Sequence, residues 1–353
     1  MSLALFRSSV RRSGWVVLVV AGLALAGCGT AADPSARKTD ADARSKTQVP
    51  SPEPVVTAWP LTGLPMDDNT VVRPALNVKI ENDRTVRPQT GLEYTDIVWE
   101  EVVEGGITRF VAVYHSQVPE EVGPVRSNRP MDPRIAGPSR GLIVFSGGMY
   151  TSQLRAAGLQ AVSMDEGTAG FYRKVGFRAP HNVFGTPQTW WDLADDKHRN
   201  NPPPQFTYAP AKQATAFASG TPAALLELTL SASAHPSWSW DAASGTWLRS
   251  EGTTPSSSRA GVRLSAVNVI VIKAPIVNTP DRDPAGSPVP DTKFEGTGTA
   301  LVATGGKTIT ATWTKASDTE VVVLTTSGGE AINLAPGNTW VELMPTDRTW
   351  VIF

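Results

Sequence analysis

Hydrophobic and polar residues alternate along much of this chain, a pattern typical of half-buried strands. In the segment 75–80 every second residue is a large aliphatic one. Two further strands are predicted at 96–103 and 107–114, with the turn Glu104-Gly105-Gly106 between them. A short apolar run at 142–145 predicts a buried strand. The N-terminal half is therefore expected to contain a sheet with at least one hairpin.

Helix signals are interspersed with these strands. A helix is predicted at 151–157, with Thr151 as its N-cap. Another is predicted to begin with Thr186 as N-cap and Pro187 at its first position, where the fixed φ of proline suits a helix. Strands mixed with helices predict an α/β or α+β N-terminal domain over residues 59–200.

Beyond the proline-rich linker at 202–204 the helical signal fades. Short strand patterns with glycine turns recur instead, at 238–241, 246–250, 266–272 and on either side of Gly305-Gly306 and Gly328-Gly329. This pattern predicts a mostly-β C-terminal domain over residues 205–353.

The first residues follow a different pattern. Three arginines within the first twelve residues precede an apolar stretch at 15–26, which is short for a membrane span. The stretch ends in Leu25-Ala26-Gly27-Cys28, which resembles a bacterial lipobox. We expect residues 1–27 to be a lipoprotein signal peptide and Cys28 to be lipidated, with an ordinary secretory signal or a short uncleaved anchor as the alternatives. The lipobox interpretation places the protein on the outer face of the cytoplasmic membrane.

Residues 28–58 are rich in small, polar and charged residues and have almost no large apolar ones, so we expect a flexible tether. Cys28 is the only cysteine, which excludes an internal disulfide and a cysteine-type zinc site. The formal net charge of −1 gives no reason to expect a nucleic-acid partner. The histidines lack metal-site spacing and the nucleotide-binding glycine motifs are absent, so no metal or cofactor is expected.

Several sequence blocks support a family assignment. They are RPALNVKIEN at 73–82, RPQTGL at 87–92, EGGITRF at 104–110, GPVRSNRP at 123–130 and PHN at 180–182, followed by GGK at 305–307, TW at 312–313 and PGNTWVE at 336–342. Together they resemble the DUF3048 family over nearly all of the chain after the tether. The resemblance implies a two-domain surface lipoprotein, and it supplies no catalytic residues.

Arginine is unevenly distributed. Between Arg73 and Arg178 there are eleven arginines and two lysines, whereas five of each follow Gln205. Arginine is favoured where carboxylate or phosphate is bound by two parallel hydrogen bonds. Because Arg109 lies on a strand between the apolar Ile107 and Val111, we expect it to be buried and to pair with nearby glutamates. For Arg126 and Arg129, bracketed by glycine and proline, an open anion pocket is favoured over a structural ion-pair network.

Four other features carry weaker signals. Gly147 and Gly148 lie between a strand and a helix, where backbone N–H groups can face an anion, although a tight turn explains them as well. His181 is either a satisfied loop histidine or a general acid/base. Glu100 and Glu101 should face opposite sides of a strand, which argues against a paired-carboxylate site. The tryptophans of the β-rich half are expected to fill a core, with an exposed sugar-stacking row as the alternative.

The sequence therefore favours a non-catalytic protein that binds or scaffolds at the cell envelope, held on the membrane through Cys28. Its partner would be a cell-wall polymer or an envelope protein. The alternative is an enzyme acting on an anionic, phosphate-containing envelope polymer or lipid intermediate. In that case Arg109, Arg126 and Arg129 would hold the charge and His181 would move the proton.

Overall fold

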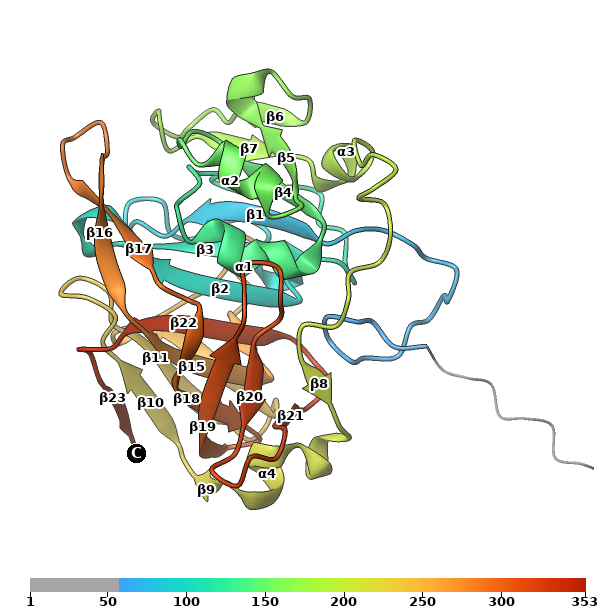
Figure 1. Cartoon of the computed structure of the whole chain (residues 1–353), viewed down its shortest axis with the longest axis vertical. Coiled ribbons are helices and arrows are strands. Elements are labelled where there is room, and N and C mark those ends of the chain that lie inside the picture. Colours follow the sequence, from blue (N-terminus) through green and yellow to red (C-terminus); the bar gives the residue numbers. More distant parts are fainter. Residues whose placement is uncertain (1–56) are drawn as a thin grey trace, which may run out of the picture. The chain divides into compact units, whose positions relative to one another are not determined.

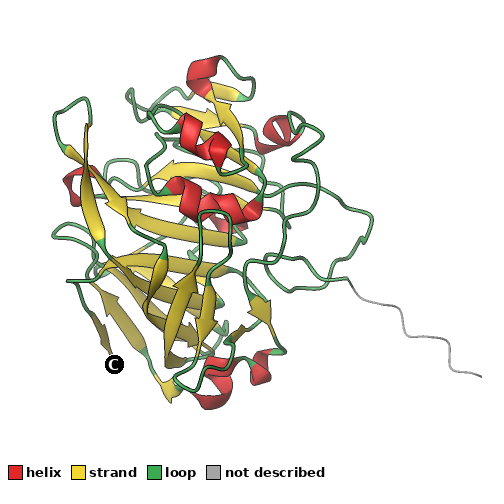
Figure 2. Ribbon diagram, in the orientation of Figure 1, coloured by secondary structure: helices red, strands yellow, loops and turns green. Residues whose placement is uncertain are grey.

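The computed structural model describes residues 57–353, so Cys28, the predicted signal peptide and nearly all of the predicted tether lie outside the described residues. The described residues belong to one compact unit. Within the described range, none of the helices is long and apolar enough to cross a membrane. The helices are short and few beside the strands (Figure 2). They are α1 (Asp132–Ala136), α2 (Thr151–Ala156), α3 (Pro187–Trp191) and α4 (Thr215–Ser219).

An 11-stranded sheet runs through the whole unit in the order β20-β19-β18-β15-β22-β2-β3-β1-β4-β5, with β9 paired to β19 (Figure 1). The N-terminal half supplies β1 (Leu76–Glu81), β2 (Ile97–Val102), β3 (Thr108–Tyr114), β4 (Leu142–Phe145) and β5 (Gln160–Ser163). The C-terminal half supplies β9 (Thr221–Pro222), β15 (Asn268–Ala274), β18 (Gly296–Thr304), β19 (Lys307–Lys315), β20 (Val323–Thr325) and β22 (Thr339–Pro345). The halves join where β2 and β22 pair in parallel, from Ile97 opposite Thr339 to Glu100 opposite Glu342.

A second, six-stranded sheet has the order β13-β12-β11-β10-β23, with β14 paired to β12. Its strands are β10 (Leu225–Leu228), β11 (Pro236–Asp241), β12 (Thr246–Glu251), β13 (Thr254–Pro255), β14 (Ser265–Ala266) and β23 (Trp350–Ile352). Three small two-stranded sheets are made by β6 (Phe171–Arg173) with β7 (Val183–Gly185), β8 (Thr207–Tyr208) with β21 (Asn333–Leu334), and β16 (Ile276–Arg282) with β17 (Pro288–Thr292).

Both faces of the central sheet are covered. On one face, Val98 and Phe110 share a hydrophobic cluster with Trp238 and Trp247 of the second sheet. On the other face, residues such as Trp99 and Val111 cluster with side chains of α1 and α2. The hairpin β16–β17 also reaches these helices, where Tyr150 donates to Asp281 at 2.9 Å and Arg134 to Asp291 at 2.8 Å. Successive side chains of a strand point to opposite faces, and both faces of this sheet are covered. Even the polar residues of β1–β3 are therefore buried.

The structure confirms the predicted class, a mixed N-terminal region followed by a mostly-β region. The hairpin of β2 and β3 has its turn at 104–106, and β4 lies at 142–145 as predicted. Thr186 is the N-cap of α3, with Pro187 first in the helix. The predicted cap of α2 is wrong by one residue. Tyr150 is the N-cap, and Thr151 begins the helix and accepts a hydrogen bond from Asn128 through its hydroxyl at 3.3 Å.

The tryptophans fill the core. Trp238, Trp247, Trp313 and Trp340 are at most 2% exposed, so they cannot form a surface row that stacks on sugars. Trp240 and Trp350 are partly buried against the same hydrophobic cluster. The core interpretation is confirmed for these residues.

Candidate functional site

A loop at 82–89 leaves the end of β1 and is surrounded by three adjoining hollows, which we call the 82–89 groove. Their volumes are about 450, 560 and 820 Å³. The first two share Asn82, Arg84, Arg87 and Glu251 as lining residues. The third is lined by the loop residues Thr85 and Val86. The groove therefore brings the segment after β1 and strand β3 together with β12 and the residues that follow it.

The loop is fixed by the amide of Asn82, which is 1% exposed. Its oxygen accepts from Arg87 Nε at 3.0 Å and from Gln89 Nε2 at 2.9 Å, and its nitrogen donates to Thr108 Oγ1 at 2.8 Å. Asp83 accepts from the backbone N–H of Thr85 at 2.8 Å, a local turn that aspartate favours. Together these bonds hold Arg84 at the tip of the loop.

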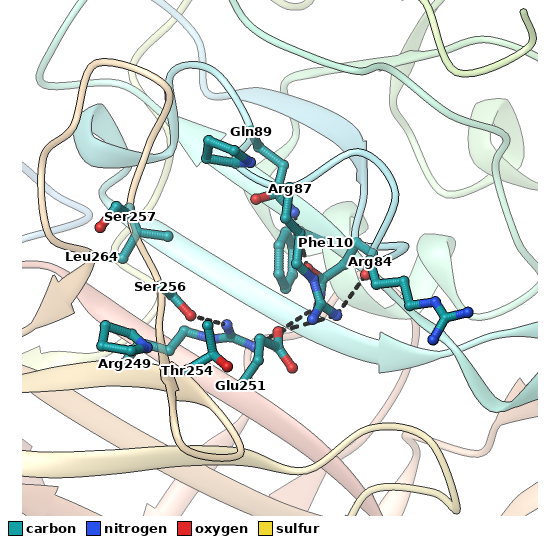
Figure 3. A pocket seen from close by; sticks show the side chains of 13 residues that line it. Arg84, Arg87, Gln89, Phe110, Arg249, Glu251, Thr254, Ser256, Ser257 and Leu264 are labelled. Atoms are coloured by element: carbon teal, nitrogen blue, oxygen red, sulfur yellow. Dashed lines mark hydrogen bonds and ion pairs between the residues drawn. The ribbon is translucent and has the colours of Figure 1, made fainter. Parts of the chain in front are cut away.

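The first hollow lies between the loop, Phe110 of β3 and the segment around Arg249 (Figure 3). Glu251 Oε1 is 3.3 Å from Arg87 Nη2 and 2.7 Å from Arg249 Nη2. The Arg87–Glu251 pair separates the first hollow from the second. Figure 3 shows the Arg84 side chain extending away from this pair. Arg84 is exposed and forms no ion pair among residues 57–353.

The third hollow is lined by Arg178, His181 and Arg259, with no carboxylate among its lining residues. Arg259 stacks on Phe177, with its guanidinium carbon 4.6 Å from the ring centroid, and donates to the carbonyl of Pro88 at 3.1 Å. Because Pro88 also lines the first hollow, Arg259 joins the two hollows. Arg178 and Arg259 are exposed and, within the described part of the chain, neither has an acidic partner.

Five arginines and two carboxylates, Asp83 and Glu251, line the three hollows. Both carboxylates are engaged. Glu251 is shared by Arg87 and Arg249. Burial raises the pKa of Asp83, but the hydrogen bonds from Thr85 and the charges of His181 and Arg87 bring it below its usual value. The groove thus presents an excess of cationic donors.

Of the predicted site residues, Arg126 and His181 meet on one carboxylate. Glu81 is 2% exposed, and its Oε1 lies 2.9 Å from His181 Nδ1 and 3.3 Å from Arg126 Nε. Arg126 Nη1 also donates to the carbonyl of Pro180 at 3.3 Å. The His181 side chain is 35% exposed, so its free nitrogen can face the third hollow, which it lines.

The expected open position is wrong for Arg129. Its side chain is 9% exposed, with Nε 2.6 Å and Nη2 2.7 Å from the two carboxylate oxygens of Glu104. The reason is tertiary: the turn between β2 and β3 brings Glu104 against the 126–129 loop. The prolines on either side of these arginines predict a loop, but they do not predict which distant segment packs over that loop.

Arg109 is buried, as predicted from its strand neighbours, and is 4% exposed. Its nearest carboxylate oxygen, of Glu104, is 4.0 Å away, and its Nη1 donates to the carbonyl of Ser127 at 3.0 Å. Burial, together with the charges of Arg129 and Arg126, lowers the pKa of Arg109 to about 10. Arg109 therefore belongs to a buried charged layer behind Arg126.

Gly147 and Gly148 pack against the 126–129 loop next to this charged layer. The N–H of Gly147 donates to Asp165 at 2.6 Å, so it already has an acceptor within the chain. A Cβ on Gly147 would lie 2.7 Å from Ser127 Oγ, and one on Gly148 would overlap Asn128. Both residues have positive φ, which favours glycine. They let the 126–129 loop pack closely against the turn before α2.

Two buried acid clusters lie on opposite faces of the same strands, as expected for Glu100 and Glu101. Lys79 contacts both Glu101 and Asp132, the latter at 2.8 Å, and all three side chains are fully buried. Burial and the neighbouring Asp132 raise the pKa of Glu101 to about 8, against the opposing effect of Lys79. One lysine thus serves two carboxyl groups, and burial beside Asp132 favours the protonated form of Glu101.

On the other face, Arg249 binds Glu100 at 2.7 Å and donates to Ser256 Oγ at 3.0 Å. Glu342 lies beside Glu100 in the β2–β22 pairing and accepts from Trp238 at 2.9 Å. Burial and the charge of Glu100 raise the pKa of Glu342 well above its usual range. This cluster fixes the second sheet beneath the 82–89 groove.

Sequence reasoning missed Arg84, Arg87, Arg178 and Arg259 as site residues. The local arginine excess was the available signal for the first three. Nothing in the sequence around Arg259 or Glu251 places them beside the loop, because that contact is made only by the second sheet.

Two family models match this chain. Residues 61–200 match "Protein of unknown function (DUF3048) N-terminal domain" and residues 226–341 match the C-terminal domain of the same family. The first lining segment of the groove, 82–110, falls in the first match and the second, 249–264, in the other. The groove therefore lies where the two matched regions meet.

A protein from Bacillus subtilis (strain 168), "Putative lipoprotein YerB", is 26% identical over 303 residues, covering 81% of this chain and 86% of that protein. A crystal structure of the YerB protein from Bacillus subtilis superposes with a TM-score of 0.70 at 24% identity, covering 84% of this chain and 99% of that chain. This likeness supports the same fold. With both family models matched in order along one compact unit, the chain belongs to the DUF3048 family.

Proposed function

We propose that this protein is a lipid-anchored binding module on the outer face of the cytoplasmic membrane, and that the 82–89 groove holds an anionic, phosphate-containing envelope ligand. The observation that carries the proposal is the third hollow. Arg178, Arg259 and His181 line about 820 Å³ without a carboxylate, and the two arginines have no ion-pair partner among residues 57–353. Unpaired guanidinium groups at a concave surface are suited to phosphate.

The anchor is supported by the Leu25-to-Cys28 motif and by the name of the Bacillus subtilis relative. Cys28→Ser should move the protein from the membrane fraction to the soluble fraction, or leave an uncleaved precursor. Labelling with a palmitate analogue reads lipidation directly. Unchanged labelling and fractionation in the variant would refute the anchor.

Ligand binding is tested on the full chain in detergent with pyrophosphate as the probe. Pyrophosphate at about one hundred times its dissociation constant should stabilise the fold by about 2.7 kcal/mol and raise the melting temperature. The Arg178→Ala, Arg259→Ala double variant should lose most of this shift. Arg282→Ala is the matched control, because Arg282 is exposed on the β16–β17 hairpin and donates only to the carbonyl of Gly286. An equal shift in the double variant would exclude the third hollow.

The His181–Glu81 pair favours a second candidate function, hydrolysis of a phosphate ester. A carboxylate 2.9 Å from Nδ1 fixes the orientation of the ring, so that the other nitrogen can face a substrate and exchange a proton with it. The test is hydrolysis of p-nitrophenyl phosphate and of its phosphodiester analogue. Turnover that is lost in His181→Gln, while pyrophosphate binding is kept, would establish catalysis. No turnover leaves the binding role alone.

A further inference from the structure

We infer that the ligand of the 82–89 groove is a linear phosphate polymer that contacts more than one of the three hollows at once, rather than a single small anion. This inference rests on the proposed function. Its basis is the juxtaposition of three hollows around one loop, with arginines that have no acidic partner among residues 57–353 at two separate places: Arg84 where the first and second hollows meet, and Arg178 with Arg259 at the third.

The hollows adjoin through shared walls. Arg87 and Glu251 line both the first and the second. Arg259 lines the third and donates its backbone N–H to Gln89 at 2.7 Å, while Gln89 lines the first. A ligand held in one hollow therefore lies next to the cations of another. A single phosphate would leave the distant arginines unused.

The donor arrangement favours phosphate over carboxylate. One guanidinium fork satisfies a planar carboxylate, as Arg129 does with Glu104. In the third hollow Arg178, His181 and Arg259 come from two separate segments, and donors arriving from several sides suit a tetrahedral oxyanion. Neither aromatic ring that lines the hollows is a free stacking surface: Phe110 is 1% exposed, and the half-buried Phe177 already carries the Arg259 guanidinium over its ring. The groove thus offers charge without a platform for stacked bases.

Two linked contact points predict a dependence on chain length. Once one part of a polymer is bound, the next part is present at high effective concentration, which raises affinity by about 10² to 10⁴. The experiment compares the affinity of the full chain for orthophosphate, pyrophosphate, tripolyphosphate and long-chain polyphosphate. Ligand concentrations are expressed per phosphate group, because a long chain offers many equivalent binding positions and would otherwise appear to bind more tightly for that reason alone. We expect a gain of at least about 100-fold per phosphate from pyrophosphate to the long chain.

Single-residue variants distinguish the contributions of the two contact points. Arg178→Ala should weaken every probe, whereas Arg84→Ala should weaken only the long chain, with Arg282→Ala as the matched control. Each arginine removed from the contact should also reduce the salt dependence of long-chain affinity by about one charge equivalent.

Three results would overturn the inference. Long chains that bind no more tightly per phosphate than pyrophosphate would refute the polymer while leaving anion binding intact. Polygalacturonate binding as tightly as polyphosphate would refute the phosphate assignment. Tighter binding of single-stranded oligonucleotides than of polyphosphate would indicate base recognition instead. Failure of every probe, pyrophosphate included, would instead reject the proposed function itself.

Discussion

The arginines of this protein fall into two groups that differ in what surrounds them. Arg129 and Arg249 are buried, and each is held by glutamates at 2.6–2.7 Å. Arg84, Arg178 and Arg259 are exposed around the 82–89 groove, without an acidic partner in the described part of the chain. Arg126 is intermediate, because its side chain is 19% exposed and it shares Glu81 with His181.

The difference shows that one residue type serves two purposes within one region. A buried guanidinium without a partner would be very costly, so the folded chain supplies carboxylates to it. An exposed guanidinium retains its hydration and needs no internal partner, which leaves it available to a ligand. The number of arginines in the sequence therefore indicates neither a salt-bridge network nor a binding site until their burial is known.

Removing a buried arginine should have the largest effect. Arg249→Met leaves the buried Glu100 without a cation and leaves Glu251 with Arg87 alone, and we expect a loss of about 3–5 kcal/mol in the free energy of unfolding. Urea denaturation of wild type, Arg249→Met and the surface control Arg282→Ala measures it. If Arg249→Met lost no more than the control, the buried cluster would not be a stabilising element.

Arg126 and Arg129 provide the sharpest test within one loop. Arg129→Ala leaves the buried Glu104 with only the more distant Arg109, at 4.0 Å, and should cost about 3 kcal/mol. Arg126→Ala should cost about 1 kcal/mol, because Glu81 keeps His181 as a partner and the side chain is partly exposed. Thermal unfolding of the two variants and of the wild type measures the two losses of stability. Equal losses would place both arginines in the same group.

The buried carboxyl cluster should make stability fall as pH rises. Glu101 has a folded-state pKa of about 8, whereas an unfolded glutamate titrates near about 4.3. Between these values the native state binds more protons than the unfolded state, so this group lowers stability with rising pH, by at most about 1.4 kcal/mol per unit. Glu101→Gln should remove this slope. Urea unfolding at about pH 5.5 and 7.5 compares the two proteins, and parallel curves would contradict the raised pKa.

The groove arginines should have the smallest effect on stability. Arg84→Ala and Arg178→Ala should each stay within about 0.5 kcal/mol of wild type in ligand-free protein, since neither is paired or buried. A slight gain is expected where like charges stand close together. Thermal unfolding without added anions measures this. A loss above about 2 kcal/mol would mean that these arginines are structural.

Much of the local structure could be predicted from the sequence. Alternation located β1, the β2–β3 hairpin and β4, and the proline at position 187 located the start of α3. These features depend on side-chain period and backbone chemistry, which are local properties. The opposite orientation of Glu100 and Glu101 followed from the same period. The burial of Arg109 followed from its apolar strand neighbours.

Other features depend on contacts between distant segments. The parallel pairing of β2 with β22 places Glu100 beside Glu342, which is far away in sequence. Glu104 covers Arg129 only because the β2–β3 turn folds against the 126–129 loop. Asp165 occupies the N–H of Gly147, a contact that no glycine pattern reveals.

The sequence by itself indicated β1, the β2–β3 hairpin, β4, the helices α2 and α3, the family and the local abundance of arginine, because each of these follows from residue order and spacing. Only the tertiary structure decided which arginines are buried and which face the groove. The physical reason is that burial is set by which distant surfaces pack together, and burial determines whether a guanidinium must be neutralised within the protein or can remain free for a ligand.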